Sequence, residues 1–326
     1  MALTAFAAAP GYQLKNQIKL GGEGFWDYTS IDSAARRLYV SHGAKVIVVN
    51  VDTEKTEGEI TGLKGVHGIA IAPDLNRGFI SSGGDNEAVI FDLKTLAVLD
   101  RVKTGANPDA ILYDPATKQV FTFNGRGKDA TVIDAVTGKV AGTIALGSKP
   151  EFAAADGKGN VYVNLEDLSK VSVIDAKTRT VTHTYPLAPC EEPSGMAMDT
   201  AKGRLFIGCS NKMMAIVDTA SGKVLATPPI GDGVDANSFD PGTGLAFSSN
   251  GEGTVTVVGE TSPGKFEVVE TVKTRRGART MTVDTKTHRL YLPSAEFGPA
   301  PVATAANPHP RPAMLPGSFV ILVVGK

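Results

Sequence analysis

Seven positions with ionisable or hydroxyl side chains recur along this 326-residue chain at steps of 40 to 44 residues. The chain contains seven similar segments, and most of them end in Asp. The seven positions are found by aligning the segments on their last residue and counting back five residues from it. The set holds four carboxylates, an imidazole, a hydroxyl and a guanidinium: Asp27, His67, Asp109, Glu151, Ser194, Asp235 and Arg279. This composition is not that of an apolar core. It predicts either a ligand site or a ring of solvated charges.

Carboxylates that lie close together repel one another unless a cation or a hydrogen-bond donor lies between them. Arg279 and a protonated His67 are the internal candidates for that role, and a bound cation or cationic ligand is the external one. Carboxylate oxygens suit hard cations. A divalent cation is therefore the cofactor that this set would admit, although nothing in the sequence fixes its ligands.

Aromatic and basic residues lie beside these positions. Trp26, the sole tryptophan, stands between Phe25 and Asp27–Tyr28, and is expected either to fill the core or to offer a stacking surface. The basic run from Lys273 to Arg279 could join it in binding single-stranded nucleic acid or another polyanion. The formal net charge of −1 argues against general attraction to nucleic acid, so we expect such binding to be a secondary alternative.

Histidine spacing gives no established catalytic motif. HxH and HExxH are absent from the sequence, as are C-x-x-C and G-x-S-x-G. His42, His67 and His309 could still converge as a three-histidine metal site. The sequence therefore favours binding without catalysis over the alternative of a metal-dependent, lactonase-like hydrolase.

The elements that position these residues are short strands. Five aspartates, each after an apolar run and before a polar turn, are separated by 40, 42, 41 and 43 residues: Asp52, Asp92, Asp134, Asp175 and Asp218. Each unit holds four runs of strand-like residues separated by turn formers. Four strands in a repeat of this length predict an all-β, seven-bladed β-propeller with four-stranded antiparallel blades.

The two ends of the chain complete this prediction. The last unit lacks one strand, and residues 12–20 are expected to supply it as the outer strand, so that no sheet edge is left open. The proline-rich segment 295–317, which carries His309 and Arg311, is expected to be a loop on the channel face. It could act as a lid, bind a partner or be an inert flap.

The second strands carry a recurring signature: "YVSH" from Tyr39, "FISS" from Phe79, "FTFN" from Phe121, "YVNL" from Tyr162, "FIGC" from Phe206 and "YLPS" from Tyr291. From about Tyr12 to Lys326 the chain resembles the YVTN-repeat (YncE-like) seven-bladed β-propeller family. That resemblance implies an exported protein, because members of the family are mostly exported proteins of unassigned or binding role.

Residues 1–9 are small and apolar, with two A-x-A patterns, and resemble the end of a signal peptide; a disordered alanine-rich tail is the alternative. We expect residues 10–326 to form one propeller domain that is periplasmic or secreted, monomeric, and without a transmembrane segment. It would bind a small ligand, a metal ion or a partner protein at the channel mouth. Cys190 and Cys209 could form a disulfide in an oxidising compartment, provided that the strand register brings them together.

Overall fold

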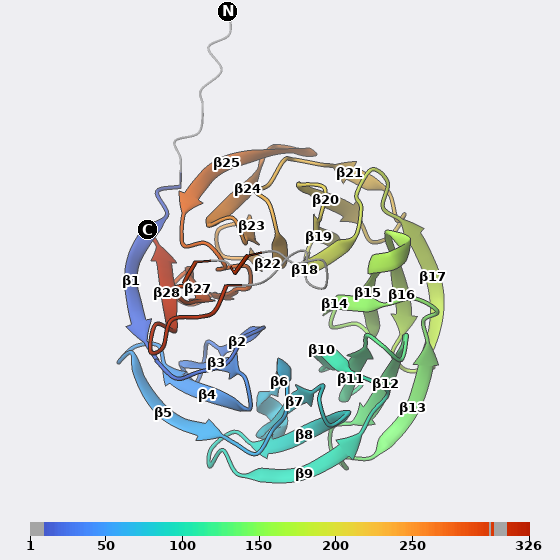
Figure 1. The fold of residues 1–326 in the computed structure, drawn as a ribbon. Coiled ribbons are helices and arrows are strands. Elements are labelled where there is room, and N and C mark those ends of the chain that lie inside the picture. Colours follow the sequence, from blue (N-terminus) through green and yellow to red (C-terminus); the bar gives the residue numbers. More distant parts are fainter. Residues whose placement is uncertain (1–9, 300, 303–311) are drawn as a thin grey trace, which may run out of the picture.

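The computed structural model describes residues 10–299, 301–302 and 312–326. Within them, 28 strands form seven four-stranded antiparallel sheets, which surround a central channel as blades (Figure 1). Two short 3-10 turns, η1 (Pro73–Leu75) and η2 (Glu166–Leu168), are the only helical elements in these ranges. The predicted all-β, seven-bladed propeller is confirmed.

Each blade runs from an innermost strand at the channel to an outermost strand at the rim. The first three blades are β2 (Thr29–Asp32), β3 (Arg37–His42), β4 (Lys45–Asn50) and β5 (Lys55–Ile60); β6 (Val66–Ala72), β7 (Arg77–Ser82), β8 (Glu87–Asp92) and β9 (Val98–Lys103); and β10 (Pro108–Asp114), β11 (Gln119–Asn124), β12 (Asp129–Asp134) and β13 (Val140–Ala145). The next two are β14 (Pro150–Ala155), β15 (Asn160–Leu165), β16 (Lys170–Asp175) and β17 (Thr180–Pro186); and β18 (Pro193–Asp199), β19 (Arg204–Cys209), β20 (Met213–Asp218) and β21 (Val224–Ala226). The sixth is β22 (Val234–Asp240), β23 (Leu245–Asn250), β24 (Thr254–Ser262) and β25 (Lys265–Lys273). The seventh is β26 (Thr282–Asp284), β27 (Arg289–Ser294), β28 (Val320–Gly325) and β1 (Gln13–Lys19).

The repeated aspartates are turn residues between the third and fourth strands. Asp134 Oδ1 accepts hydrogen bonds from the backbone N–H groups of Val136 and Thr137, at 3.0 and 2.7 Å. Gly138 follows with a φ of 73°, and the register then shifts by one residue, which is the pattern of a bulged hairpin. The recurring phrase in the sequence therefore specifies where each blade folds back on itself.

The ring is closed within the seventh blade. The N-terminal strand β1 pairs antiparallel with β28, from Gln13 opposite Gly325 to Lys19 opposite Val320. In Figure 1, β1 lies on the rim beside β28, close to both ends of the described chain. The predicted role of residues 12–20 as the outer strand is confirmed, and it removes an exposed edge.

Apolar packing between blades holds the ring together. Seven buried hydrophobic clusters exist among the described residues, and each joins two neighbouring blades. The interface between blades one and seven also contains an ion pair, in which Arg36 Nη1 lies 2.8 Å from Oδ2 of the fully buried Asp284. Arg36 also contacts the exposed Asp52, so one guanidinium joins the two blades at the closure.

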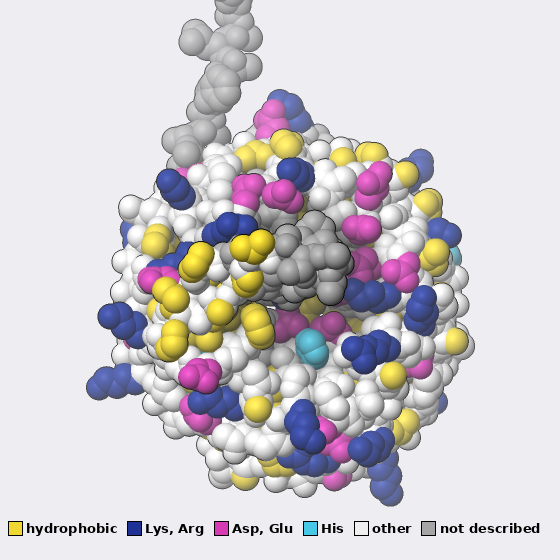
Figure 2. Space-filling view, viewed as in Figure 1, with side chains coloured by type: hydrophobic (Ala, Val, Ile, Leu, Met, Phe, Trp, Pro, Cys, Tyr) yellow, Lys and Arg dark blue, Asp and Glu magenta, His cyan; other side chains and the backbone are white. Residues whose placement is uncertain are grey.

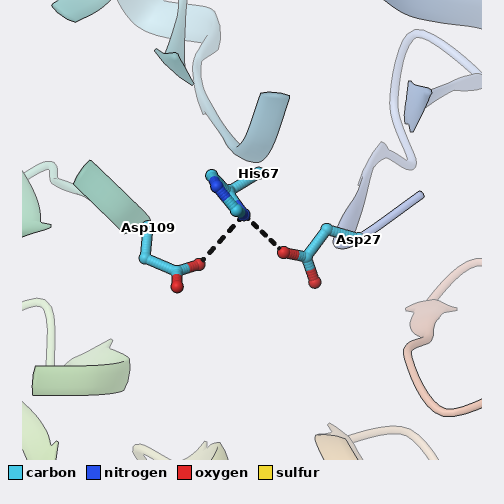
Figure 3. A group of neighbouring side chains, drawn as sticks. All are labelled: Asp27, His67 and Asp109. Atoms are coloured by element: carbon cyan, nitrogen blue, oxygen red, sulfur yellow. Dashed lines mark hydrogen bonds and ion pairs between the residues drawn. The ribbon is translucent and has the colours of Figure 1, made fainter. Parts of the chain in front are cut away.

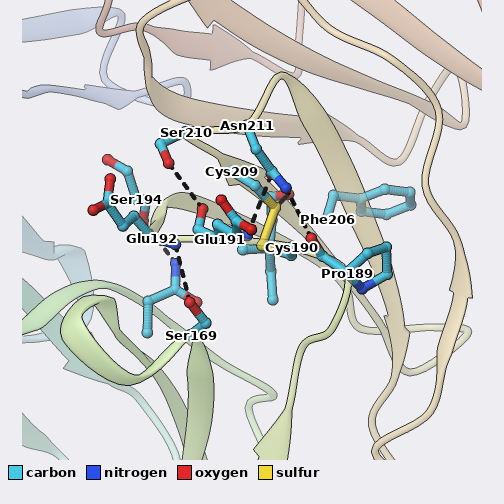
Figure 4. The surroundings of a disulfide bond; sticks show 12 residues. Ser169, Pro189, Cys190, Glu191, Glu192, Ser194, Phe206, Cys209, Ser210 and Asn211 are labelled. Carbon is cyan, nitrogen blue, oxygen red and sulfur yellow. Dashed lines mark hydrogen bonds between the residues drawn. A yellow bond between two sulfur atoms is a disulfide. The ribbon is translucent and has the colours of Figure 1, made fainter.

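A disulfide joins the two cysteines in the fifth blade (Figure 4). Cys209 ends β19 and lies opposite Pro193 at the start of β18. Cys190 precedes β18 and is brought within 5.5 Å of Cys209, measured between Cα atoms. No helix in the described part of the chain has the length and hydropathy needed to span a membrane.

Candidate binding site at the channel mouth

The seven predicted site positions lie at or just before the first residues of the innermost strands. In five blades the register between the first and second strands shifts beside this position, next to His67, Asp109, Glu151, Ser194 and Asp235. Such bulges bend a strand and re-aim a side chain, and they are common beside functional sites. The fold therefore brings the predicted residues to one end of the channel.

Polar residues of the second strands fix the backbone of this ring. Ser81 Oγ donates to the carbonyl oxygen of Asp109, Asn164 Nδ2 donates to that of Ser194 at 2.7 Å, and Ser249 Oγ donates to that of Arg279. Each bond runs from one blade to the next. Ser81 and Asn164 occupy the third position of the recurring second-strand signature, and Ser249 occupies the equivalent place in β23, which gives that position a physical role.

One arc of the mouth holds a histidine between two carboxylates (Figure 3). His67 Nδ1 lies 2.7 Å from Asp27 Oδ2 and 3.5 Å from Asp109 Oδ1. One potential metal-ligand atom from each of these three residues lies within 4.8 Å of the other two. Figure 3 shows the three side chains pointing toward a common centre from three consecutive blades. Asp109 Oδ1 is buried and lacks a hydrogen-bond partner among the described residues.

The opposite arc is already paired. Asp235 Oδ2 lies 2.7 Å from Arg279 Nη1, and Ser194 Oγ donates to Asp235 Oδ1 at 2.9 Å. Glu151 forms an ion pair with Lys149, which also contacts Glu166. The sequence argument missed Lys149, because it stands outside the repeated position and only its side-chain direction places it at the mouth.

Burial and mutual repulsion shift the protonation of these groups. Burial, followed by the charge of Asp27, raises the pKa of Asp109 above its ordinary value. Burial and the charge of Asp109 likewise raise the pKa of Glu151. Burial by itself lowers the pKa of His67, but Asp27 and Asp109 outweigh it, so that the pKa is raised. The mouth therefore favours bound protons or cations.

The space-filling view of this face shows a central hollow in which acidic and histidine side chains gather, with lysine and arginine side chains farther out (Figure 2). Beneath the acidic ring, Tyr28 from the first blade meets Phe152 from the fourth, with centroids 5.1 Å apart. A cavity of about 300 Å³, lined mostly by apolar residues such as Ile69, Ile111 and Ala153, continues along the inner strands.

Packing decides between the two alternatives for Trp26, which are core filling and a stacking surface. The stacking surface predicted for Trp26 is not formed: Trp26 is only 8% exposed and packs between Phe297 and Phe319 in the core. Phe25, at 61% exposure, is the exposed member of the group. The reason is that the segment after β27 folds back, pairing Phe297 with Met314 and covering Trp26.

The predicted three-histidine site has no support from the described residues. His42 is 1% exposed and stacks on Phe319 at 4.1 Å between centroids, and it is not part of the cluster of potential metal ligands around His67. His309, also predicted to bind ligand, lies outside the described residues, as do residues 1–9 and the middle of the 295–317 loop.

Comparison with known proteins identifies the fold and no more. No protein-family model matches the chain, and no curated protein matches it. Among solved structures it is similar to a chain of hydrazine synthase from Kuenenia stuttgartiensis, with 15% identity and a TM-score of 0.73 over 90% of this chain and 95% of that one. The seven-bladed architecture is thereby supported, and the YVTN-repeat family stays a prediction. The fold is consistent with a binding role.

Proposed function

We propose that this chain is an exported binding protein that holds a small cationic ligand, organic or inorganic, at the acidic mouth of its channel. The observation that carries this proposal is Asp109. Its Oδ1 atom is buried and has no hydrogen-bond partner among the described residues, while the other ring carboxylates each have a cation or a donor. A buried carboxylate oxygen without a partner is costly unless a ligand supplies the missing contact.

The charge balance supports the same ligand class. The ring has four carboxylates, and Arg279 and Lys149 neutralise two of them. His67 neutralises one more only when it is protonated. A cationic ligand would restore the balance, whereas an anion would add to the repulsion. A partner protein could supply the same group as a lysine or arginine side chain.

Export is proposed on the disulfide between Cys190 and Cys209, because structural disulfides persist mainly in oxidising compartments. Its presence suits the periplasmic or secreted location that the sequence predicts.

The experiment is a thermal-unfolding and calorimetric survey of organic amines, quaternary ammonium ions and divalent metal chlorides. A true ligand should stabilise the protein by about 2.7 kcal/mol at a hundredfold excess over its dissociation constant. Asp109→Asn should remove that gain, and Asp100→Asn, on the exposed strand β9, should retain it. The proposal is wrong if no cation stabilises the parent protein, or if Asp109→Asn responds as the parent does.

The alternative of a metal-dependent, lactonase-like hydrolase would use the same carboxylates. Lactone hydrolysis measured with and without a chelator separates it from pure binding.

The alternative of single-stranded nucleic acid binding is weakened, because Trp26, which was expected to stack on bases, is buried. Filter binding of a labelled oligonucleotide at two salt concentrations would test what remains of that alternative.

A further inference from the structure

We propose that one arc of the mouth is a metal site, in which Asp27, His67 and Asp109 together bind one divalent transition-metal ion. This inference rests on the proposed cation-binding function and narrows it to a defined atom set. Each of the three residues offers one donor atom, and these atoms lie within 4.8 Å of one another. Nδ1 of His67 lies 2.7 Å from Asp27 Oδ2 and 3.5 Å from Asp109 Oδ1. Donors this close need only small side-chain rotations to reach a common ion at metal–ligand distances of about 2.0–2.2 Å.

Hydrogen bonds among the described residues leave one atom of this arc, Asp109 Oδ1, without a partner. Both carboxylates approach the same ring nitrogen, Nδ1 of His67, which carries at most one proton. That proton is positioned for Asp27 at 2.7 Å, so Oδ1 of Asp109, at 3.5 Å, receives no hydrogen bond from His67 or from any other described residue. A metal ion forms a bond to each of the three atoms at once. It therefore satisfies the oxygen of Asp109 that hydrogen bonding within the described part of the chain does not.

The scaffold of this arc is pre-organised. The backbone N–H of Asp27 donates to Ser41 Oγ at 2.8 Å, and the carbonyl of Asp27 accepts from Thr280 Oγ1 at 2.7 Å. In the next blade, Ser81 Oγ accepts from the N–H of Gly68, the residue after His67, and donates to the carbonyl of Asp109. Ligands supported in this way hold their geometry, which is what metal affinity requires.

The donor set also selects the class of ion. An imidazole nitrogen suits zinc, iron and other first-row transition ions, whereas calcium and magnesium prefer sites made of oxygen alone. Two carboxylates and one imidazole leave coordination positions open toward the hollow. We therefore expect Mn²⁺, Fe²⁺, Co²⁺ or Zn²⁺ to bind, with Ca²⁺ and Mg²⁺ binding more weakly.

A second His–Asp pair in the chain serves as a control for metal binding. His288 Nδ1 lies 2.7 Å from Asp240 Oδ2, the same distance as between His67 and Asp27. No second carboxylate joins that pair in any candidate metal cluster among the described residues. If a single His–Asp contact were sufficient for metal binding, both pairs would bind, so variants of His288 report nonspecific binding.

The experiment uses the full chain after removal of metal by a chelator and dialysis. Calorimetry and metal analysis with MnCl₂, CoCl₂, ZnCl₂, CaCl₂ and MgCl₂ should find one transition ion per chain. Bound Mn²⁺ and Co²⁺ should show altered electron paramagnetic resonance and visible absorption spectra. Asp27→Asn, His67→Gln and Asp109→Asn should each weaken binding by at least about 100-fold, because loss of an outer-shell contact alone costs 10–100-fold. His288→Gln should bind as the parent does.

The outcomes separate the two proposals. If no transition ion binds the parent, or if His67→Gln keeps the parent's affinity, the metal assignment is wrong. If an organic cation then still stabilises the parent and fails to stabilise Asp109→Asn, cation binding at the mouth stands without a metal. If neither metals nor organic cations bind, both proposals are wrong. Thermal unfolding of each variant without metal identifies any variant that is misfolded, and the other two variants then decide.

Discussion

Tyr28 and Phe152, which come from blades one and four, meet edge to face across the channel with ring centroids 5.1 Å apart. The Tyr28 ring is buried, and burial together with the charges of Asp109 and Asp235 raises its pKa well above the ordinary value. Both rings line the apolar cavity, and each directly follows a carboxylate of the acidic ring, Asp27 or Glu151, in the sequence. The carboxylates therefore act in a partly enclosed space, where charge interactions are stronger than in water.

Phe152→Ala should open the floor of the mouth. We expect a loss of about 2–3 kcal/mol in the free energy of unfolding, below the 3–5 kcal/mol of a fully enclosed phenylalanine because Phe152 is half-buried. Cation affinity should also fall, since water can then reach the carboxylates from below. Urea unfolding and calorimetry measure both. Tyr28→Phe keeps the ring contact and should retain parent stability; equal losses in the two variants would contradict the role of the pair.

Deleting residues 12–20 should abolish cooperative unfolding, because it leaves β28 with an unpaired edge and uncovers apolar surface. A milder variant tests the same strand: Ile18→Ala should cost about 2–4 kcal/mol, since Ile18 is 4% exposed. Lys15→Ala, at an exposed position of β1, is the matched control. Calorimetric unfolding is the measurement, and a truncated protein that melts at the parent's temperature would refute the closure.

Replacing both cysteines with alanine should lower stability by roughly 3 kcal/mol, the loop-entropy value for cysteines 19 residues apart. Reducing agent should have a similar effect on the parent protein and none on the variant. Thiol titration of unfolded, unreduced protein should find no free thiol. Two free thiols would show that the bridge does not form.

Glu260 on β24 should make the protein sensitive to acid. It accepts hydrogen bonds from Arg204 at 2.7 Å and Lys202 at 2.8 Å, which link blades six and five and hold its pKa at about 2. A lowered carboxylate pKa stabilises the fold above the ordinary glutamate range, and that contribution is lost as pH falls from about 4.5 toward 2.

Glu260→Gln should therefore cost about 1–2 kcal/mol near neutral pH, a value reduced by solvent screening. The difference between variant and parent should shrink as the pH falls through that window. Urea unfolding at a series of pH values measures it, with Glu23→Gln, at an exposed position, as the control. A difference that stays constant with pH would contradict this account.

The fold was largely predictable because its signals are local and repeated. Each Asp-containing turn between third and fourth strands depends on a few neighbouring residues, as Asp134 and Gly138 illustrate, and the constant spacing then dictates a ring. The positions at the mouth were predictable for the same reason, since equivalent positions in a closed ring must lie around its axis.

What could not be predicted depends on contacts between distant segments. Trp26 is buried because Phe297 and Phe319, more than 270 residues away, cover it from a segment without periodicity. The pairing of Lys149 with Glu151 depends on side-chain direction at a bulge, which hydrophobic alternation does not encode. The close approach of Asp27, His67 and Asp109 likewise required the actual tilt of three blades.

The pairing of Gln13 with Gly325 has a consequence for how the protein folds. β1 precedes the other described strands along the chain and its partner β28 follows them, so the two paired strands are separated by the sequence of six complete blades. Contacts of such long sequence separation form slowly, because the cost of closing the loop comes before any gain. During that interval six blades can assemble one after another, and the seventh forms only when the two ends meet. The meeting of β1 and β28, rather than the formation of any single blade, therefore sets the moment at which the ring becomes stable.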